Sequence, residues 1–565
     1  MSDNILDVKD FGAKGDYNFT TNTGTDDTTA FRNAIAQLRR NGGGVLKIPD
    51  GVYYLPTTTP FLIDTSNSHI QGSGNATLYM PNIPADIAGI ALRGQIEQAI
   101  TNVTQSIARG SNQIVVADVT PFRPGDLIAI RSAENFNPDR SSISKGEFAR
   151  IRSIDASNRR LVLMGSIFDD YNDVYSIYVD RILPIRNVSV SNVIVRMGGS
   201  GKRQNGIHIK YFDNASVRHV RTERIEQTGI ILGMGIHFVA HQNHVLDANM
   251  PEFGVGILIS GCEHGEVTQN HGEYCRHTID ISGHGTDIIS RFITVDNNTA
   301  ENNSSAGIST HGGTEYITVS TNYVVNCGGG IIIRGRTHTV TDNYITNVLN
   351  PAQSTEVYNA GIFLGDDGPN HTWGNGLAGT NVIIKYNQIL LTTTGHGIYS
   401  TAPLINASIE GNNIVTANGK NGMHFKGNYN DRVMIRNNMI DCTKQTPGSY
   451  NFGIFFTPTT GSQKHSDIYI LDNQIIRPGY SGIRIDASRV QANMSDDLVM
   501  RGNLIRESAR RGIDLSVGFF KRVRIESNVM LDIDKPNTYP YDLPISYTAG
   551  SFPLTPPLLL NNYSD

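Results

Sequence analysis

The sequence predicts an all-β chain wound as a right-handed parallel β-helix, and three observations support this prediction. A Gly-apolar-x-apolar word recurs between about residues 187 and 535, at the spacing of roughly one 22-residue coil plus loops of variable length. An apolar-x-x-Asn-x-apolar word comes some eight residues before many of these glycines. Short β-branched segments with period-two alternation lie between the words, and no stretch of this region keeps the 3.6-residue spacing of a helix over ten residues.

A stacked coil explains both words. Inward-facing Ile and Val fill a continuous core, while Asn and Gly tolerate the left-handed backbone of tight corners. Asn side chains at one corner are expected to line up and hydrogen-bond along the stack. A β-propeller fits less well, because its blades repeat every ~40–45 residues. The repeated glycines are Gly206, Gly229, Gly256, Gly307, Gly330, Gly361, Gly397, Gly422, Gly453, Gly482 and Gly512, with Thr278 once in this place, and the repeated asparagines are Asn298, Asn322, Asn343, Asn387, Asn412, Asn438, Asn473, Asn503 and Asn528.

Composition excludes several classes of protein. The chain has 565 residues with 57 Gly and 22 Pro, a pattern that fits neither collagen nor a disordered chain. Its formal charge of −5 and lack of a long basic block argue against nucleic acid as a partner. No apolar run approaches the ~18 residues of a membrane span, so membrane insertion is not expected. The four cysteines show no CxxC spacing and are expected to be buried free thiols.

The start of the chain is predicted to cap the solenoid. Asp26, Asp27 and Thr28 precede the spaced apolar residues of an amphipathic helix that ends at the glycines after Asn41. A strand follows at 45–49. Such a helix covers the exposed core and the unpaired edge of the first coil. The polar opening MSDNILDVKDFGAKGD lacks a signal peptide's basic and apolar regions, so we expect synthesis in the cytoplasm.

The words DVKDFGAKGD, TDDTTAFRNAI, GGGVLKIPDGVYYL and IQGSGNATLYM resemble the opening of the pectate-lyase-like β-helix superfamily. This superfamily includes pectin and alginate enzymes and many bacteriophage tailspike depolymerases. The resemblance implies a β-helix that binds or cleaves polysaccharide. For a tailspike it also implies a parallel homotrimer that is incorporated into a virion or released. It makes Gly72 and Gly74 corner residues instead of a nucleotide-binding loop.

Four segments are predicted along the chain. Residues 101–180 interrupt the repeat with short strands separated by Pro-Gly-Asp and Ala-Ser-Asn turns, which predict a small inserted antiparallel β module. The Pro-rich, apolar end is predicted to lie extended along a surface or a neighbouring subunit. The predicted segments are an N-terminal cap with the first coils at 1–100, the inserted module at 101–180, the main β-helix at 181–535 and an extended tail at 536–565.

Aligning the glycine words predicts a candidate site. With Gly as position zero, positions one and three point inward and positions two and four point to solvent. Neighbouring coils then bring together Asp280, with Arg276 and His277 just before it, and His311 and Arg334. His311 exchanges a proton near neutral pH, Asp280 orients it, and Arg334 binds a uronate carboxylate or stabilises developing charge. A solvated polar ladder is the structural alternative.

Further residues are candidates for substrate binding. Asp366 and Asp367 follow the next coil, later coils supply Tyr399, His424 and Lys426, and a long loop carries Trp373. An aromatic and charged groove suits an extended sugar chain, whose rings stack on aromatic side chains. Scattered surface aromatics are the alternative. Outward-facing Ile231, Ile332, Phe363 and Phe455 are candidates for subunit contact.

Two resemblances to enzyme motifs are incomplete. The word Ser282-Gly283-His284-Gly285 resembles the GHG word of polygalacturonases, but the carboxylates those enzymes carry on the preceding coils are absent. The stretch around His311 resembles the catalytic coil of alginate epimerases. Ser309, Ala306 and Gly329 stand where those enzymes have an acid, a tyrosine and a second aspartate. These departures put both activities in doubt.

The predicted function is cleavage of an acidic extracellular or cell-surface polysaccharide. β-Elimination needs a base and a cation, which His311 or His277 with Arg334 or Arg276 supply. Hydrolysis needs two carboxylates about 5–9.5 Å apart, for which Asp280 with Asp366 or Asp367 is the nearby supply. The excess of cations slightly favours a lyase. A non-catalytic glycan-binding adhesin of a phage tail is the alternative, and a scaffold without a ligand is a third. No cofactor or metal is expected, although Ca²⁺ on Asp366 and Asp367 stays open.

Overall fold

The computed structural model carries side chains for most of the chain. The residues it describes are 4–137, 143–199, 201–283, 288–348, 359–365, 377–416, 419–427, 429–442, 449–457, 465–486, 495–516, 520–533, 545–547 and 558–564. They divide into two compact units. Unit 1 comprises residues 1–299 and 313–315, and unit 2 comprises residues 300–312 and 316–565. No helix of the described part is both long and apolar enough to cross a membrane.

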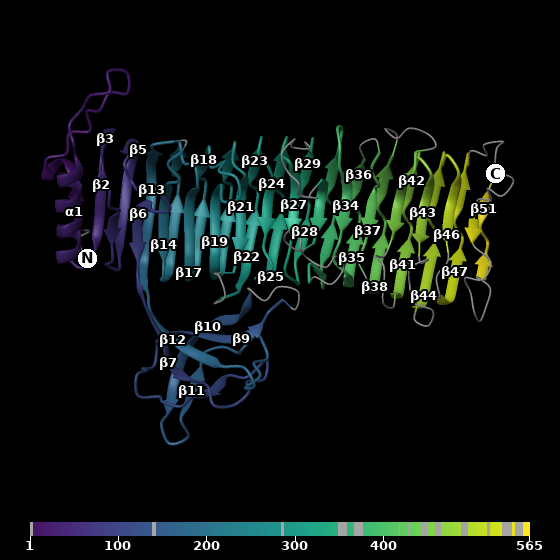
Figure 1. Ribbon diagram of the computed structural model, residues 1–565, viewed down its shortest axis with the longest axis horizontal. Helices are drawn as coiled ribbons and strands as arrows, with labels where there is room; N and C mark the ends of the chain where they lie inside the picture. The colour runs from purple at the N-terminus through teal and green to yellow at the C-terminus, as the bar shows by residue number, and fades with distance from the viewer. Residues whose placement is uncertain are drawn as a thin grey trace. The chain divides into compact units, whose positions relative to one another are not determined.

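The capping helix is confirmed as α1 (Thr28–Arg40), at the purple end of Figure 1. Ala30, Phe31, Ala34, Ile35 and Leu38 form its buried face. The expected N-cap differs in detail. The Asp27 carboxylate makes no bond to the helix and instead accepts hydrogen bonds from the backbone N–H groups of Lys14 (2.7 Å) and Gly15 (3.0 Å). Asp27 therefore ties the loop before the helix to the helix start.

Unit 1 begins the parallel β-helix. Its strands pair in parallel with strands about one coil away in the sequence. The described coil strands of this unit are β1 (Ile5–Asp7), β2 (Gly44–Ile48), β3 (Gly51–Tyr54), β4 (Phe61–Ile63), β5 (Ser68–Met80), β6 (Ala88–Arg93), β13 (Ile185–Met197), β14 (Asn205–Lys210), β15 (Phe212–Arg218), β16 (Arg221–Glu223), β17 (Thr228–His241), β18 (His244–Leu246), β19 (Val255–Thr268), β20 (His271–Glu273), β21 (His277–Ser282) and β22 (Ser290–Asp296).

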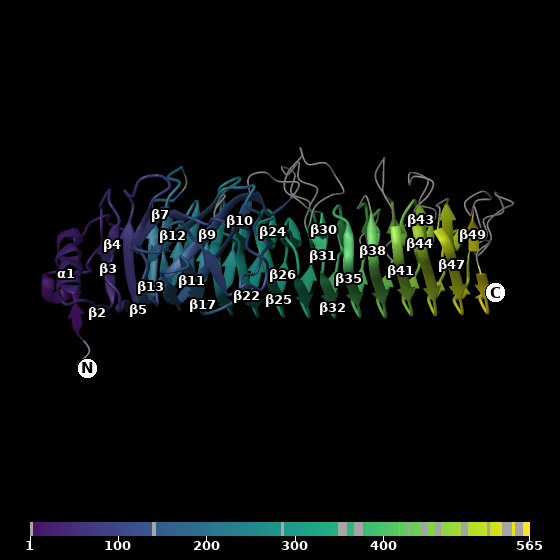
Figure 2. The same cartoon turned by 90° about the horizontal axis from the view of Figure 1, so that it is seen from below.

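Unit 2 repeats the same coil, and Figure 2 shows its strands following one another in order. Strands β23 (Thr299–Glu301) and β25 (Thr314–Ser320) have residues in both units. The other described strands of unit 2 are β24 (Ala306–Thr310), β26 (Tyr323–Val325), β27 (Gly329–Ile333), β28 (Thr339–Thr341), β29 (Tyr344–Thr346), β30 (Ala360–Leu364), β31 (Gly379–Thr380), β32 (Ile383–Lys385), β33 (Gln388–Leu390), β34 (His396–Ser400), β35 (Leu404–Glu410), β36 (Asn413–Val415), β37 (Met423–Phe425), β38 (Asn430–Arg436), β39 (Met439–Asp441), β40 (Phe452–Phe456), β41 (His465–Leu471), β42 (Gln474–Ile476), β43 (Ser481–Asp486), β44 (Ser495–Arg501), β45 (Leu504–Arg506), β46 (Arg511–Ser516), β47 (Phe520–Glu526), β48 (Val529–Leu531), β49 (Ile545–Tyr547), β50 (Leu558–Leu560) and β51 (Tyr563–Ser564).

The asparagine ladder is confirmed in both units. In unit 2, Asn438 donates from its backbone N–H and its Nδ2 to Oδ1 of Asn473, at 3.0 and 2.9 Å, and Asn473 repeats this with Asn503. Unit 1 has the same bonds between Asn243 and Asn270. Buried polar groups need hydrogen-bond partners, and each rung provides them for two adjacent coils. Asn562, in the segment predicted as a tail, accepts as the last rung described, and β50 and β51 pair in parallel with β47 and β48.

The left-handed corners lie one residue away from the ladder. Gln242 and Gln269, directly before the ladder residues Asn243 and Asn270, have φ of +53° and +54°. Other positions of these coils are also left-handed, such as His237 and Asp247 in the first. The repeated Asn word in the sequence therefore identifies the asparagine of the hydrogen-bonded ladder. The left-handed corner positions are occupied by Gln, His or Asp as well as by Asn and Gly.

The repeated glycines serve close packing of adjacent coils. A Cβ atom on Gly453 would lie 2.5 Å from Cγ2 of Ile475 and 2.6 Å from the carbonyl oxygen of Gly482. Both distances are far inside van der Waals contact, so any larger residue would push the coils apart. The glycine of the Gly-apolar-x-apolar word is therefore needed for the close approach of adjacent coils and not for a turn.

The inserted module is a separate antiparallel sheet of unit 1. Its strands run in the order β7-β12-β9-β10-β11-β8. They enclose a core of their own that includes Val116, Ile128, Ile151 and Tyr171. The strands are β7 (Gln95–Asn102), β8 (Gln113–Val115), β9 (Leu127–Asn135), β10 (Ser144–Asp155), β11 (Arg160–Leu163) and β12 (Ile177–Leu183).

The four cysteines are buried free thiols, as the sequence predicts. Burial raises the pKa of Cys262, Cys327 and Cys442 to about 12. These thiols are therefore protonated and unreactive near neutral pH.

Asn473→Ala should weaken the ladder of unit 2. It leaves the backbone N–H and Nδ2 of Asn438 without their shared acceptor in a buried setting, which costs about 1–3 kcal/mol. Urea unfolding followed by far-UV circular dichroism measures the loss. The control is Gln474→Ala at the exposed neighbouring position, expected to stay within ~0.5 kcal/mol of the parent. Equal stability of the two variants would contradict the role given to the ladder.

Candidate functional site

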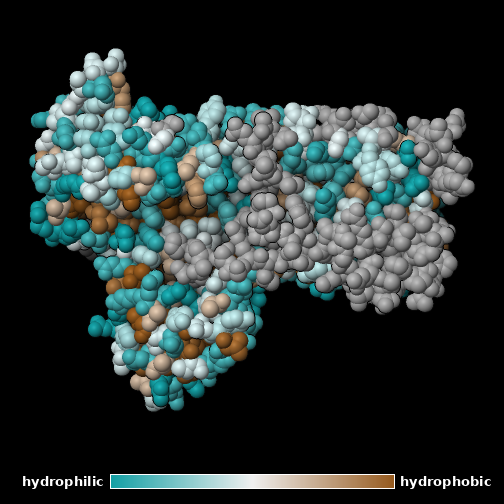
Figure 3. All heavy atoms as spheres, viewed as in Figure 1, coloured by the Kyte–Doolittle hydropathy of each residue, from teal (hydrophilic) through white to brown (hydrophobic). Residues whose placement is uncertain are grey.

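The inserted module contacts the coils of unit 1 through an apolar interface. Leu127, Ala129, Phe148 and Ile182 of the module form one buried cluster with coil residues Tyr211, Met234, Ile236 and Ile288. Figure 1 shows the module beside the coil strands, and Figure 3 shows apolar residues, in brown, on both. We call this contact region the junction. It fixes the module against the coils and thereby builds a site from segments far apart in the sequence.

A buried charged cluster lies at the junction. Arg291 on β22 is fully buried; its guanidinium contacts the Asp169 carboxylate and donates from Nε to Oε2 of Glu315 at 3.1 Å and from Nη1 to the Gly146 carbonyl at 3.1 Å. The carboxyl groups of Glu147 and Glu263 are also close enough to raise the pKa of Arg291, which burial alone would lower. We call Glu147, Asp169, Glu263, Arg291 and Glu315 the junction cluster.

Two acids of the junction cluster hold their protons unusually tightly. Burial raises the pKa of Glu263 to about 8, although Arg291 partly opposes the shift, and the neighbouring carboxyl of Glu147 adds to it. Burial raises the pKa of Glu147 in the same way. Oε1 of Glu263 accepts a hydrogen bond from the Phe148 backbone N–H at 3.1 Å. Glu263 is therefore largely protonated near neutral pH.

Glu263 lines a pocket of about 250 Å³ at the junction. The module contributes Arg150 and Phe168 to the wall, and the coils contribute His237 and His264. The remaining lining residues are Leu127, Phe148, Ala149, Leu163, Met164, Gly165, Ser166, Ile167 and Ile236. The pocket thus combines an apolar floor with a protonated carboxyl, a guanidinium and two imidazoles.

A ladder of rings runs along the coil corner beside the pocket. His237 stacks on His264 with ring centroids 5.7 Å apart, and His264 stacks on Phe292 at 5.0 Å. Phe292 contacts Phe168 of the module at 4.8 Å. All three coil residues have left-handed φ near +56°, which turns successive rings outward from the same corner. Flat rings of this kind are surfaces on which sugar rings stack.

Asp213 is the second carboxylate near the pocket. It accepts from Nη2 of Arg150 at 2.8 Å, pairs with Nδ1 of His237 at 3.2 Å and lies 3.6 Å from Nε of Arg186. Burial acts to raise the pKa of Asp213, but the hydrogen bonds and charges of His237 and Arg150 outweigh it, so the pKa is lowered. Asp213 is opposite Ile236, which is opposite Glu263. Two strand spacings, or ~9.6 Å of backbone, therefore separate an ionised carboxylate from a protonated one.

The predicted proton-transfer residues fall into both units. Arg276, His277 and Asp280 belong to unit 1, where His277 and Asp280 lie on β21 and are 1% and 4% exposed. His311 and Arg334 belong to unit 2, just after β24 and β27. These strands pair in parallel, so His311 and Arg334 stand at neighbouring strand ends. The catalytic roles given to these five residues stay predictions.

The Arg334 guanidinium is held by the neighbouring coil, through β24. It is 2% exposed and donates from Nη1 to Ser309 Oγ at 3.1 Å and to the Thr310 carbonyl at 3.0 Å. Its own carbonyl oxygen contacts Nε2 of His338 at 2.7 Å. The guanidinium thus takes part in backbone and side-chain bonds within unit 2.

Three of the predicted substrate-binding residues also lie in unit 2. Tyr399 and His424 are buried, with rings 5.3 Å apart, and Lys426 lies 5.7 Å from the Tyr399 ring. Nε2 of His424 contacts Thr457 Oγ1 at 2.7 Å, and burial lowers the pKa of His424 to about 2. Asp366, Asp367 and Trp373 lie outside the described residues.

The expectation that position two faces solvent is wrong for Asp280 in unit 1 and for most of the described positions of unit 2. Ile332, Phe363 and Tyr399 are buried in one apolar cluster with Ala306 and Ala360. Phe455 is buried as well. Because Ile332, Phe363 and Phe455 are buried, they do not form an exposed apolar surface for contact with a second subunit.

The repeat words in the sequence do not indicate the junction residues. Glu263 lies on β19 beyond the aligned glycine word, and Asp213 lies on β15, which has no such word. Glu147 comes from a module whose docking no repeat encodes. The sequence signal that could have placed Asp213 beside Glu263 is the number of residues between equivalent positions of successive coils. Asp213, Ile236 and Glu263 follow one another at 23 and 27 residues, the same intervals as the glycines from Gly206 to Gly256.

Residues 255–438 match a family model described as the right handed beta helix region, and the right-handed parallel β-helix predicted from the sequence is confirmed. No curated protein matches the chain in sequence. Solved structures share the fold, three phage tailspikes among them. The tailspike gp61 of Pseudomonas phage phi297 is 17% identical over 89% of this chain and 81% of its own, with a TM-score of 0.61.

The tailspike gp49 of Pseudomonas phage LKA1 is 14% identical, covers 94% of this chain and 81% of its own, and has a TM-score of 0.56. The Gp54 tailspike of Acinetobacter baumannii bacteriophage AP22, solved with a capsular saccharide, is 14% identical. It covers 99% of this chain and 76% of its own, with a TM-score of 0.51. At these identities the likeness shows the fold.

Glu263→Gln should flatten the pH dependence of stability. The pKa of Glu263 in the folded chain, about 8, lies above the ordinary value of 4.5. Protonation therefore stabilises the fold fully below about pH 4.5, and this contribution is lost as the pH rises to about 8. Urea unfolding between about pH 5 and pH 8.5 measures it. Glu266→Gln, an exposed change on the same strand, should keep the parental slope. A slope unchanged in Glu263→Gln would show that this carboxyl has an ordinary pKa.

Proposed function

We propose that the chain binds an extended acidic polysaccharide and cleaves its glycosidic bonds by hydrolysis at the junction pocket. The observation that carries the proposal is the pair Glu263 and Asp213. Their environments shift the two pKa values in opposite directions on one face of the coils. Such a split pair of carboxyl groups supplies both an acid and a base at one pH.

The chemistry follows from the two protonation states. Glu263 gives its proton to the glycosidic oxygen as the bond from that oxygen to the anomeric carbon breaks. A water molecule forms the new bond to that carbon and passes its proton to Asp213. The two-strand spacing approximates the 6.5–9.5 Å that leaves room for water in inverting glycosidases.

The wall of the pocket fits a sugar chain. The stacked rings of His237, His264 and Phe292 offer flat faces to pyranose rings. Arg150 places a guanidinium beside them, which suits a carboxylate-bearing sugar. The structural likeness to three phage tailspikes, one of them solved with a capsular saccharide, supports a polysaccharide ligand. It also supports the proposal of an oligomeric, virion-associated tail protein.

β-Elimination in unit 2 is the second candidate, favoured by one observation. His311 and Arg334 stand at neighbouring strand ends and combine a base with a cation. Against this, the Arg334 guanidinium is buried and already donates to Ser309 and Thr310. Hydrolysis at the junction is therefore the better supported reaction.

The test incubates the protein with acidic and neutral bacterial polysaccharides and follows reducing ends together with the absorbance of unsaturated uronate. We expect reducing ends without the uronate signal. Glu263→Gln and Asp213→Asn should each lower the rate by about 10²–10⁴, the usual contribution of a general acid or base. The control variant Glu266→Gln should keep the parental rate of cleavage.

The other outcomes distinguish the alternatives. A uronate signal lost in His311→Ala would move the chemistry to unit 2 and establish a lyase. Polysaccharide binding without either signal would leave a glycan-binding tail protein. Full activity in Glu263→Gln would exclude the junction as the catalytic site.

A further inference from the structure

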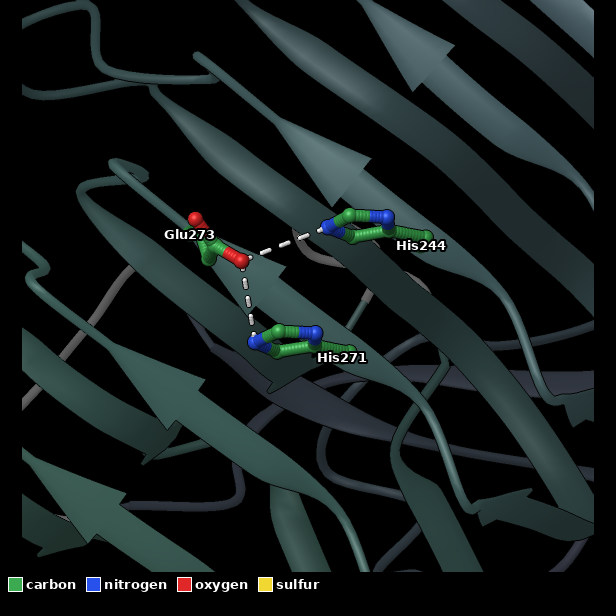
Figure 4. A group of neighbouring side chains, drawn as sticks. All are labelled: His244, His271 and Glu273. Atoms are coloured by element: carbon green, nitrogen blue, oxygen red, sulfur yellow. Dashed lines mark ion pairs between the residues drawn. The ribbon is translucent and has the colours of Figure 1, made fainter.

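Two histidines and one glutamate gather on a different face of the coils of unit 1, away from the junction strands. His244 is on β18, and His271 and Glu273 are on the adjacent strand β20 (Figure 4). Their side chains are 32%, 38% and 25% exposed. We call these three residues the His-Glu cluster.

Strand register explains why the three side chains meet. β18 and β20 pair in parallel with His244 directly opposite His271, so both rings leave the sheet on the same side. Glu273 follows His271 by two residues and therefore shares this face. The rings lie parallel, with centroids 4.8 Å apart and planes within 2°.

The three donor atoms already stand at near-coordinating distances. Oε1 of Glu273 lies 3.3 Å from Nε2 of His271 and 3.6 Å from Nε2 of His244. Two ligands of one tetrahedral Zn²⁺, each ~2.0–2.1 Å from the ion, are ~3.4 Å apart. All three atoms lie within 4.8 Å of one another, so a small rotation of the rings toward each other completes the geometry.

The charges nearby are compatible with a cation. Arg221 lies opposite His244 on β16, but its Nε pairs with Glu223 at 2.7 Å, and Glu223 also pairs with Arg196. Glu273 has the apolar Leu246 opposite it on β18. The carboxylate of Glu273 is thus directed at the imidazoles of its own cluster, as the dashed lines of Figure 4 show.

We propose that His244, His271 and Glu273 bind one Zn²⁺ ion, with a fourth coordination position open to solvent or to an added ligand. Two imidazoles and one carboxylate form a common zinc ligand set, whereas Ca²⁺ and Mg²⁺ prefer oxygen ligands alone. The ion would join adjacent coils of the β-helix. This proposal does not rest on the proposed hydrolysis, because none of its ligands belongs to the junction.

The test measures zinc binding by the full-length protein after treatment with a chelator. Equilibrium dialysis with Zn²⁺ and metal analysis should show one more ion per chain in the parent than in His244→Ala/His271→Ala. Glu273→Gln should weaken binding at this site by more than the ~10-fold that loss of an outer-shell partner costs. Added Zn²⁺ should raise the Tm of the parent more than that of either variant.

The controls separate this site from other zinc ligands and from misfolding. His241→Ala removes a histidine from another corner of the same coil, where it contacts Thr268, and should bind like the parent. Ca²⁺ and Mg²⁺ should leave the Tm unchanged. Circular dichroism checks each variant, and Glu273→Gln serves if the double variant fails to fold. Equal zinc stoichiometry and affinity in the parent and Glu273→Gln would overturn the proposal.

Discussion

The register between adjacent coils is the constraint on which the rest of the structure depends. Each coil must place its strands level with those of the next, and the asparagine ladder fixes this alignment with a pair of hydrogen bonds per rung. A slip of one residue would turn every inward side chain to the outer face. The ladder therefore protects the hydrophobic core indirectly, by making misaligned coils leave buried amide groups without partners.

The same register brings together residues that are far apart in the sequence. Asp213 and Glu263 are separated by 50 residues in the chain and by two strands in the fold. His244 and His271 are separated by 27 residues and are directly opposite each other. In a solenoid, a site therefore forms from equivalent positions on successive coils. The residue at each position can change without disturbing its neighbours. The corners add to this freedom, because their left-handed residues project side chains such as His237 and His264 outward in stacked order.

The repeat words made the fold predictable, since they record steric and hydrogen-bonding needs that recur in every coil. Gly453 and Asn473 are visible in the sequence for this reason. The site was less predictable. The repeat words do not indicate that side chains at position two of unit 2 are buried. The junction in turn depends on the docking of a module inserted some 100 residues earlier in the chain. His244, His271 and Glu273 were missed because they occupy a third face of the coil, outside the glycine strands that were aligned.

The charge balance of the junction cluster sets the protonation state of Glu263. A structural network in a buried setting gains most when each charge has a partner, because an unpaired buried charge is strongly unfavourable. Here four carboxyl groups surround one guanidinium, and the imbalance is relieved by keeping a proton on Glu263. A glutamine would accept the same hydrogen bond from the Phe148 N–H without the cost of a titrating group. The protonated carboxyl of Glu263 thus lies at a pocket beside the ring ladder, and this is the arrangement on which the proposed hydrolysis depends.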